Sequence, residues 1–289
     1  MNKLKRIALN KILVSTLCIF LLGLFYFFPS HEIVNYEIEE NDTHEKNYVY
    51  LLDKDNYVSK VITYFDSNSI VDNINKRVDI LINGSVDLEN FYGLIPSKTK
   101  LNSVKVDKNK VYLDFNSELL KINKYLASQM IESIIYSITE INGINEVYIS
   151  VDNKELKELN GILLDQPLTR DFGINKEYNI NSFNNINKTT IVFSKSNNNY
   201  LYYVPITKIN NDNDDKIKII IKELKSSINS QNNLISKLPN NIELVDYSIS
   251  DNIMNLVFDK KLDNDSEYLI YESVFENYNV SDIKFEFKK

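Results

Sequence analysis

The alternation of apolar and polar residues predicts two strands and a helix at the start of the first half of the chain. Strand-like runs at residues 48–52 and 57–64 are separated by a polar turn at residues 53–56. Apolar residues at helical spacing follow at Ile70, Ile74, Val78, Leu81 and Ile82. This stripe predicts a helix with one face against a hydrophobic core.

A hairpin, a second helix and a last strand are predicted next. Alternating apolar residues at 101–106 and 111–115 flank Asp107-Lys108-Asn109, which is a typical hairpin turn. A second helical stripe ends at Asn142-Gly143 and comprises Met130, Ile131, Ile134, Ile135, Ile138 and Ile141. Residues 147–151 alternate as a strand. The order is β-β-α-β-β-α-β, and two helices on one face of a small mixed sheet would bury both stripes.

The same pattern occurs a second time along the chain. Residues 95–106 align with residues 238–249, which is an offset of 143 in the numbering, and we expect this offset without a gap from residue 48 to residue 119. A deletion of seven residues in the second copy, near residues 120–127, then changes the offset to 136. The fold class predicted is therefore α/β (α+β), with two like-folded domains in tandem.

An uncharged apolar run at residues 12–28 precedes both copies. At about 1.5 Å per residue, a helix of this length spans roughly 26 Å, close to the hydrocarbon thickness of a bilayer. The cations near this run lie on its N-terminal side, at Lys3, Lys5, Arg6 and Lys11. The positive-inside rule then places the N-terminus in the cytoplasm and both domains outside the membrane. A cleaved signal peptide is the alternative, although Phe27-Phe28-Pro29-Ser30 lacks the small residues that cleavage needs.

The predicted organisation has five parts. They are a cytoplasmic basic tail (1–11), a transmembrane anchor (12–28), an acidic linker (29–46), a first domain with a C-terminal extension (47–180) and a second domain (189–289). We expect a single-pass protein of the cell membrane with extracytoplasmic domains. Residues 1–28 carry a charge of +4 and the rest of the chain −11, so nucleic acid is not expected as a partner.

The predicted ectodomain offers few groups for catalysis or metal binding. Cys18 lies in the apolar run, and both histidines, His31 and His44, lie in the linker. No P-loop, zinc-protease or nucleophile-elbow fingerprint occurs in the sequence. We therefore expect no enzyme, no cofactor and no metal. A glycan hydrolase with paired carboxylates is kept as a rival hypothesis, because such a site needs only two acids in a cleft.

Two clusters of polar residues have both a structural and a functional interpretation. Asp212, Asp214 and Asp215 could form a calcium loop, but they lack the glycine and glutamate of an EF-hand, and acids at the start of a helix are favoured by its dipole. Tyr200, Tyr202 and Tyr203 could form a sugar-stacking platform, but strand propensity also accounts for them. We prefer the structural interpretation of both clusters.

The first copy carries an extension, residues 161–180, that the second copy lacks. Pro167, Leu168, Thr169, Arg170 and Asp171 form a candidate partner-binding loop. Alternatively the extension is a lid packed on the first copy, with its apolar residues buried: Leu163, Leu164, Leu168 and Phe172. We prefer the packed lid.

Six segments of the first copy form a recognisable set. They are L-I-P-x-x-T (94–99), S-V-K-V (103–106), V-Y-L-D-F (111–115), Q-M-I-E-S-I-I-Y-S-I-T-E (129–140), I-N-G-I-N-E-V-Y-I-S-V-D (141–152) and L-x-x-P-L-T-R-D (164–171). On these segments the first copy resembles the GerMN domain family of sporulation and germination proteins. The second copy resembles the same domain in diverged form, without the closing L-x-x-P-L-T-R-D motif.

The resemblance implies a fold similar to the ring-building motif, an α-β-β-α-β unit of oligomeric rings in secretion systems and in the sporulation channel between mother cell and forespore. It also implies tandem GerMN domains behind a membrane-attached N-terminus, without catalytic residues. Proteins of the family are typically lipoproteins, whereas Leu17 before Cys18 does not fit a lipidation signal. The family also occurs in bacteria that do not sporulate.

The function expected from these observations is that of an assembly or scaffold protein in the envelope of a Gram-positive bacterium. Its expected partners are other membrane or envelope proteins, copies of itself included, and the cell membrane through residues 12–28. The alternative is an extracytoplasmic module that binds a ligand or the cell wall and regulates a membrane partner.

Overall fold

The computed structural model describes residues 44–85, 88–197, 200–226, 228–229, 233–236 and 238–288. Residues 44–289 form one compact unit. The predicted tail and anchor, and the linker up to residue 43, lie outside the described residues, and so do Cys18 and His31. Within the part of the chain that is described, no helix is long and apolar enough to cross a bilayer.

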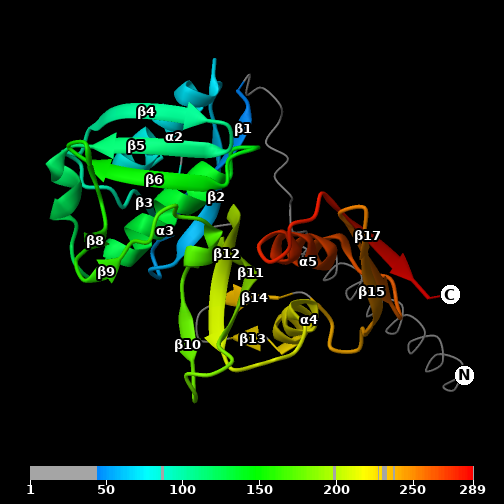
Figure 1. Ribbon diagram of the computed structural model, residues 1–289. Helices are drawn as coiled ribbons and strands as arrows, with labels where there is room; N and C mark the ends of the chain where they lie inside the picture. Colours follow the sequence, from blue (N-terminus) through cyan, green and yellow to red (C-terminus); the bar gives the residue numbers. More distant parts are fainter. Residues whose placement is uncertain are drawn as a thin grey trace, which may run out of the picture. The chain divides into compact units, whose positions relative to one another are not determined.

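The first copy has the predicted order of elements (Figure 1). Its hairpin and first helix are β1 (Lys46–Asp53), β2 (Val58–Tyr64) and α2 (Ile70–Asn83), followed by the short strand β3 (Phe91–Tyr92). Then come β4 (Leu101–Asp107), β5 (Lys110–Phe115), the 3-10 helix η1 (Ser117–Lys121), α3 (Ala127–Thr139) and β6 (Glu146–Val151). The predicted turn between β4 and β5 is confirmed, with Lys108 at a φ of 57°.

The extension and the second copy complete the chain. After β6 come β7 (Lys154–Glu155) and β8 (Glu158–Leu159), and the extension contains β9 (Ile162–Leu163), η2 (Arg170–Phe172) and β10 (Glu177–Asn179). The second copy consists of β11 (Asn187–Asn197), β12 (Tyr200–Asn210), α4 (Lys216–Ser226), β13 (Ile228–Asn229), β14 (Leu234–Ile235), β15 (Leu244–Ser250), β16 (Ile253–Phe258), α5 (Asn264–Phe275) and β17 (Asp282–Phe287).

The bounds of equivalent strands confirm the internal duplication. β15 and β16 match the bounds of β4 and β5 at the offset of 143, and β17 matches those of β6 at the offset of 136. The change of offset falls where it was predicted, because η1 and its following loop have no counterpart between β16 and α5.

The expected absence of gaps from residue 48 onward is wrong for the first strand. Tyr50 pairs with Lys60 in the first hairpin, so an ungapped offset would pair Phe193 with Tyr203. Instead Ser194 pairs with Tyr203. The β11–β12 pairing is therefore shifted by one residue relative to the β1–β2 pairing. A shift of one residue along a strand moves its side chains to the opposite face of the sheet.

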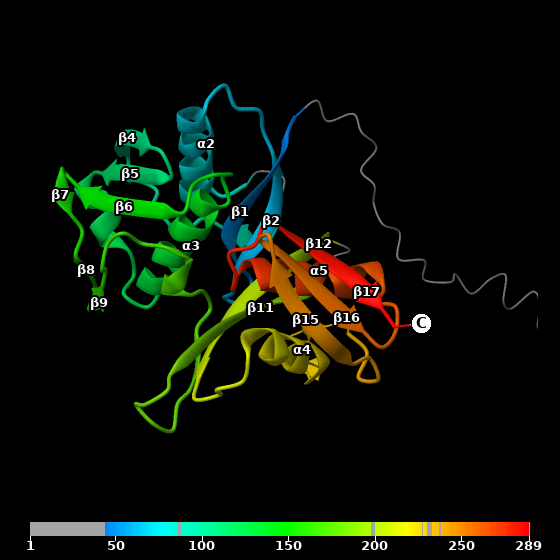
Figure 2. The same ribbon diagram turned by 45° about the vertical axis from the view of Figure 1, so that its right-hand side comes forward.

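The prediction of one small sheet with both helices on one face is also wrong. Each copy divides its strands between two sheets: β4–β6 and β15–β17 form separate sheets, while the two N-terminal hairpins share a third. Helix α3 contacts β1 on one side and β6 on the other. The physical reason is that ten of its 13 residues are buried, so one sheet cannot cover it. Figure 2 shows the β15–β17 sheet over α5 in the same way.

The shared sheet joins the two copies. Its strand order is β13-β14-β11-β12-β2-β1-β3, and β10 pairs with β12. At the junction β2 runs antiparallel to β12, with Lys60 opposite Tyr203. These two residues are also equivalent in the repeat, at an offset of 143. An antiparallel pair of equivalent residues places a local two-fold axis between the copies, so the chain resembles a symmetric dimer joined covalently.

Candidate functional site

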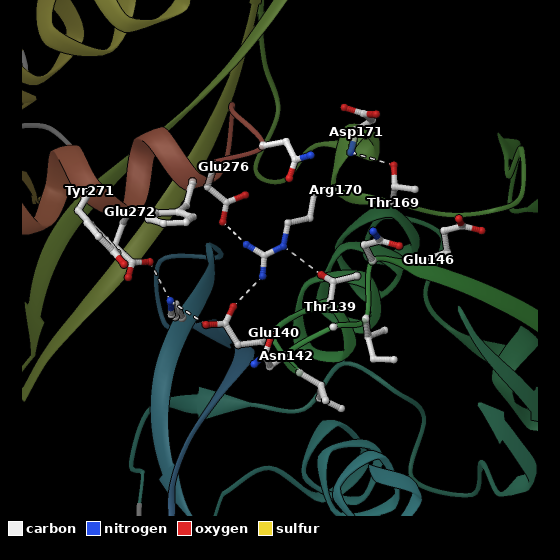
Figure 3. Close-up of a pocket in the computed structure, with 17 residues that line it drawn as sticks. Thr139, Glu140, Asn142, Glu146, Thr169, Arg170, Asp171, Tyr271, Glu272 and Glu276 are labelled. Carbon is white, nitrogen blue, oxygen red and sulfur yellow. Dashed lines mark hydrogen bonds and ion pairs between the residues drawn. The ribbon is translucent and has the colours of Figure 1, made fainter. Parts of the chain in front are cut away.

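A cleft of about 760 Å³ lies where the C-terminal ends of α3 and α5 approach each other near this axis (Figure 3). It is lined by both copies and by the extension. Five charged residues of its wall interact with one another, and they come from β2, the C-cap of α3, η2, and α5 and its C-cap: Lys60, Glu140, Arg170, Glu272 and Glu276. Glu146 and Asp171 also line the cleft. The cleft is therefore a junction between three segments that lie far apart in the sequence.

Lys60 connects the two copies through ion pairs. Its Nζ lies 2.8 Å from Oε1 of Glu140 in the first copy and 2.7 Å from Oε2 of Glu272 in the second. The Lys60 side chain is only 7% exposed, so water screens these pairs little. A buried cation thus reinforces the pairing of β2 with β12, because it forms ion pairs with the C-cap of α3 in the first copy and with α5 in the second.

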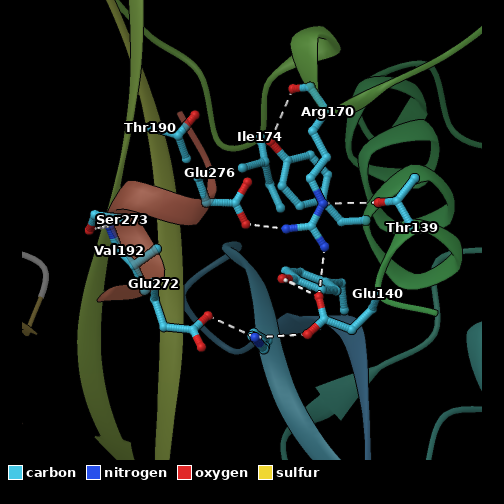
Figure 4. Close-up of polar contacts among 12 residues, drawn as sticks. Thr139, Glu140, Arg170, Ile174, Thr190, Val192, Glu272, Ser273 and Glu276 are labelled. Carbon is cyan, nitrogen blue, oxygen red and sulfur yellow. Dashed lines mark hydrogen bonds and ion pairs between the residues drawn. The ribbon is translucent and has the colours of Figure 1, made fainter. Parts of the chain in front are cut away.

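Arg170 of the extension makes the second connection (Figure 4). Its guanidinium pairs with Oε2 of Glu140 at 2.6 Å and with Oε1 of Glu276, and its Nε donates to Oγ1 of Thr139 at 3.0 Å. The guanidinium also lies over the ring of Tyr136, 4.9 Å from its centroid. Arg170 therefore binds the C-terminal ends of both helices at once.

Glu140 and Glu276 are equivalent residues in the repeat. They are related by the offset of 136, and each is the C-cap of its helix, α3 or α5. A carboxylate at a helix C-terminus is disfavoured by the helix dipole, so both positions need a nearby cation. One arginine from outside the repeat supplies that cation to both.

The two equivalent carboxyls have opposite pKa shifts. Burial acts to raise the pKa of Glu140, but the charges of Lys60 and Arg170 outweigh it and lower this pKa to about 2. Burial raises the pKa of Glu276, against the effect of Arg170. Oε2 of Glu276 is buried without a hydrogen-bond partner within the described part of the chain. The difference arises because Glu140 has two cations and Glu276 has one.

A second buried ion pair joins the copies at the other end of β1. Lys195 Nζ of β11 lies 3.0 Å from Oδ2 of Asp53, and the Tyr202 hydroxyl donates to the same oxygen at 3.1 Å. Both charged side chains are at most 1% exposed. The other Asp53 oxygen accepts from the backbone N–H groups of Asp55 and Tyr57. The Asp53 carboxylate is therefore satisfied by groups from both copies.

The chemistry of these sites favours structural cohesion. Glu140, Glu272 and Glu276 are each paired with a lysine or an arginine, so their charges bind neighbouring segments. In the described ranges no group of three or more histidine, cysteine or acidic side chains is arranged to hold a metal ion.

The lowered pKa of Glu140 predicts acid sensitivity. Its folded pKa of about 2 lies below the usual 4.5, so its stabilisation is fully present above pH 4.5 and is lost as the pH falls toward 2. The loss is on the order of 3 kcal/mol. Glu276 acts in the opposite direction, because its raised pKa favours the folded state in acid. We therefore expect Glu140→Gln to unfold with a shallower pH dependence than the unmodified chain, measured by urea denaturation at several pH values.

The control for this experiment is Glu118→Gln, at an ion pair with the largely exposed Lys121. It should keep the pH dependence of the unmodified chain. A Glu140→Gln variant with an unchanged slope would show that this carboxyl is not held by its two cations.

Comparison with known proteins agrees with the repeat and the fold. Residues 48–157 match the Germane family, described by its role in sporulation and spore germination. The chain is 26% identical over 225 residues to the spore germination protein GerM of Bacillus subtilis (strain 168), covering 74% of this chain and 60% of that protein. The solved tandem GerMN domains of B. subtilis GerM match with a TM-score of 0.77 and 22% identity, over 85% of this chain and 92% of that one.

The chain is similar to tandem GerMN-domain proteins. Its mixed α/β fold is that of the tandem GerMN domains, and the similarity at this level of identity concerns the fold. The chain aligns with about 60% of the length of the curated relative. The first GerMN domain matches the family over β1 to β7, which includes α3 and its C-cap Glu140.

The extension of the first GerMN domain is partly the lid that the sequence predicts. Leu164 and Leu168 are buried and Phe172 is partly buried, but Leu163 is 72% exposed, so its predicted burial is wrong. Leu163 and Leu164 are adjacent in an extended segment and point to opposite sides. The extension also links the two domains: Asn175 Nδ2 donates to Val58 O of the first and to Pro205 O of the second, both at 2.8 Å.

The candidate loop Pro167, Leu168, Thr169, Arg170 and Asp171 occupies this junction. Leu168 is bonded to Val147, Arg170 is bound to both GerMN domains, and Thr169 caps η2 by accepting from the backbone N–H of Asp171. Its binding to another protein stays a prediction, but Arg170 and Leu168 already have partners within the chain.

Other predicted clusters have structural surroundings. Tyr202 is buried and the hydroxyl of Tyr200 accepts from the backbone N–H of Ile62, so these tyrosines serve the junction between the domains. Asp212 and Asp215 precede α4 and pair with Lys222 and Lys218. His44 pairs with Asp66 at the start of the compact unit.

Sequence reasoning missed the other ionic residues of the junction: Lys60, Glu140, Glu272, Glu276, Asp53 and Lys195. One signal could have found two of them, because Glu140 and Glu276 occupy equivalent positions directly after the apolar stripe of each second helix. Two acids at a helix end that disfavours acids predict a common cation.

Proposed function

We propose that this protein is a membrane-anchored, extracytoplasmic scaffold that supports a sporulation or germination envelope complex through protein–protein contacts. The observation that carries the proposal is the junction of the two GerMN domains. A shared sheet, the Lys60 and Arg170 ion pairs and the Asp53–Lys195 pair fasten the domains into one body. Such a body holds its outer surfaces at a fixed spacing, which suits a part of a larger assembly.

The similarity to GerM supports the biological setting of this proposal. GerM is named a spore germination protein in one comparison and a sporulation protein in the other. The apolar run at residues 12–28 supports attachment to the membrane, with the acidic linker as a tether. The pairing of Glu140, Glu272 and Glu276 with cations favours a binding role over acid–base catalysis.

The proposal is tested in the organism that encodes the chain. We expect deletion of the gene to lower the yield of heat-resistant or germinating spores, and the full chain supplied in trans to restore it. A chain with Arg170→Met should restore it poorly, whereas Lys121→Met, at an exposed ion pair, should restore it fully. A chain that lacks residues 12–28 should also fail to restore the spore yield, because the proposed role requires attachment to the membrane.

Cross-linking of the complementing chain in sporulating cells, followed by mass spectrometry, should recover envelope proteins. A deletion strain that sporulates and germinates normally, from whose complemented form no envelope protein is recovered, would contradict the scaffold role.

A further inference from the structure

The two GerMN domains differ at the outer edge of their last strand. In the first domain the extension covers the edge of β6. Val147 and Leu168 exchange both backbone hydrogen bonds, at 2.9 and 2.8 Å. The Gln166 side chain accepts from Ile149 N–H at 2.8 Å and donates to Ile149 O at 2.7 Å. The polar groups of this edge are therefore satisfied within the chain.

Among the residues that the structure describes, the equivalent edge of β17 has no such cover. Within the described ranges, β17 pairs with β16 and with no other strand. Ile283, Phe285 and Phe287 are the counterparts of Val147, Ile149 and Val151 at the offset of 136. The first-domain residues are all buried, whereas Phe285 and Phe287 are half-buried. The second domain thus presents a strand edge that the same fold covers in the first domain.

The backbone groups of Ile283, Phe285 and Phe287 face outward from the sheet. Their counterparts Val147 and Ile149 direct their backbone N–H groups to the extension, away from β5. At the end of the parallel β16–β17 pairing, Lys288 N–H donates to Phe258 O, so the even-numbered residues bond to β16. Alternate residues of a strand direct their backbone groups to opposite neighbours. The odd-numbered residues of β17 therefore direct their N–H and C=O groups away from β16, where the Ile283 N–H donates to Oδ1 of its neighbour Asp282 at 2.8 Å.

At the opposite margins of these small sheets, β4 and β15 carry a feature that opposes pairing. The β4–β5 register shifts between Leu101 and Ser103, and the β15–β16 register shifts between Leu244 and Asp246. Such bulges twist an edge and hinder the addition of a strand. The β16–β17 register runs from Asp282 to Phe287 without a shift. The edge of β17 is therefore straight and, within the described part of the chain, uncovered.

We propose that the β17 edge pairs with β17 of a second copy of this chain, antiparallel and across a two-fold axis at Phe285. In this register the residues whose backbone groups point away from β16 pair with one another. Phe285 lies opposite Phe285, and Ile283 lies opposite Phe287. On the other face Lys284 lies opposite Glu286, and Asp282 lies opposite Lys288. Each pair occurs twice, so every charged residue of the exposed face meets an opposite charge.

Neighbouring registers lack this complementarity. Moving the axis to Lys284 places Lys284 opposite itself and Asp282 opposite Glu286. Moving it to Glu286 places Glu286 opposite itself and Lys284 opposite Lys288. Like charges directly opposite each other destabilise a strand pair, so the charge pattern selects the axis at Phe285. This inference does not depend on the proposed sporulation role, because it concerns the shape and charge of one strand edge.

The test uses charge reversals in the full chain, purified in dodecyl maltoside, with the mass of the protein measured by light scattering. Lys284→Glu places Glu opposite Glu286, and Glu286→Lys places Lys opposite Lys284, so each variant should dissociate at least about tenfold more readily than the unmodified chain. A mixture of the two variants restores opposite charges at both positions and should form mixed dimers. The double variant Lys284→Glu/Glu286→Lys should also dimerise.

Both substituted residues are exposed, and circular dichroism should show unchanged unfolding of each variant. The proposal is supported when the unmodified chain and the mixture are dimeric and the single variants are not. It is overturned if the unmodified chain is monomeric, if Lys284→Glu dimerises equally well, or if mixing fails to restore the dimer. None of these results depends on sporulation, so failure of this proposal and failure of the scaffold role can be told apart.

Discussion

Replacement of Arg170 by methionine is expected to lower the free energy of unfolding by about 3 to 5 kcal/mol. Methionine keeps most of the apolar contact with Tyr136 but removes the charge shared by Glu140 and Glu276. Glu140 keeps Lys60 as a partner, whereas Glu276 is left as a buried carboxylate without a cation. Urea denaturation of residues 44–289, which form a compact unit, measures the loss.

Two further variants identify the cause of that loss. Lys121→Met removes an ion pair whose lysine is 68% exposed, and should change stability by no more than about 0.5 kcal/mol. Adding Glu276→Gln to Arg170→Met removes the buried carboxylate that has lost its cation, and should recover part of the stability. If the double variant is destabilised by the sum of the two single effects, Arg170 and Glu276 do not act as a pair.

Lys195→Met is expected to cost a similar amount, about 3 to 5 kcal/mol. It leaves Asp53 fully buried with hydrogen bonds from Tyr202 and two backbone N–H groups but without a cation. Because Lys195 belongs to the second domain and Asp53 to the first, the loss also weakens their junction. Thermal unfolding followed by circular dichroism measures the effect.

The matched control is Lys218→Met, at an ion pair with Asp215 on the surface. Its melting temperature should stay close to that of the unmodified chain. The double variant Lys195→Met/Asp53→Asn should be more stable than Lys195→Met, because the amide at position 53 carries no charge that would be buried without a cation. A Lys195→Met chain as stable as Lys218→Met would mean that the buried pair contributes little.

The elements of the fold could be predicted from the sequence because they depend on local spacing. Ile74, Val78 and Leu81 recur at helical intervals, and all three are buried in α2. The Asp107–Asn109 turn likewise follows from residue types alone. The division of strands between two sheets could not be predicted in this way, because it depends on contacts between distant segments. The one local indication of this division is the apolar stripe of α3, which is too wide to be covered by a single sheet.

The candidate site was predicted in part. Arg170 was singled out within a segment that the second copy lacks, but its ion-pair partner Glu276 lies 106 residues away. Residue spacing gives no information on such a distance, so the sequence alone predicts only a lid or a partner-binding loop for this segment. The repeat supplies the missing information, because it relates Glu140 to Glu276 and Lys60 to Tyr203. Once the copies are joined at that strand pair, the two glutamates must approach the same place.

The two GerMN domains form a single body, and equilibrium unfolding with a reporter in each domain tests this most directly. The chain contains no tryptophan, so Tyr112→Trp on β5 and Tyr247→Trp on β15 each give a fluorescence signal from one domain. We predict that the two signals change together in urea, with the same midpoint and slope. Two separate transitions, with one domain still folded while the other is unfolded, would contradict the claim.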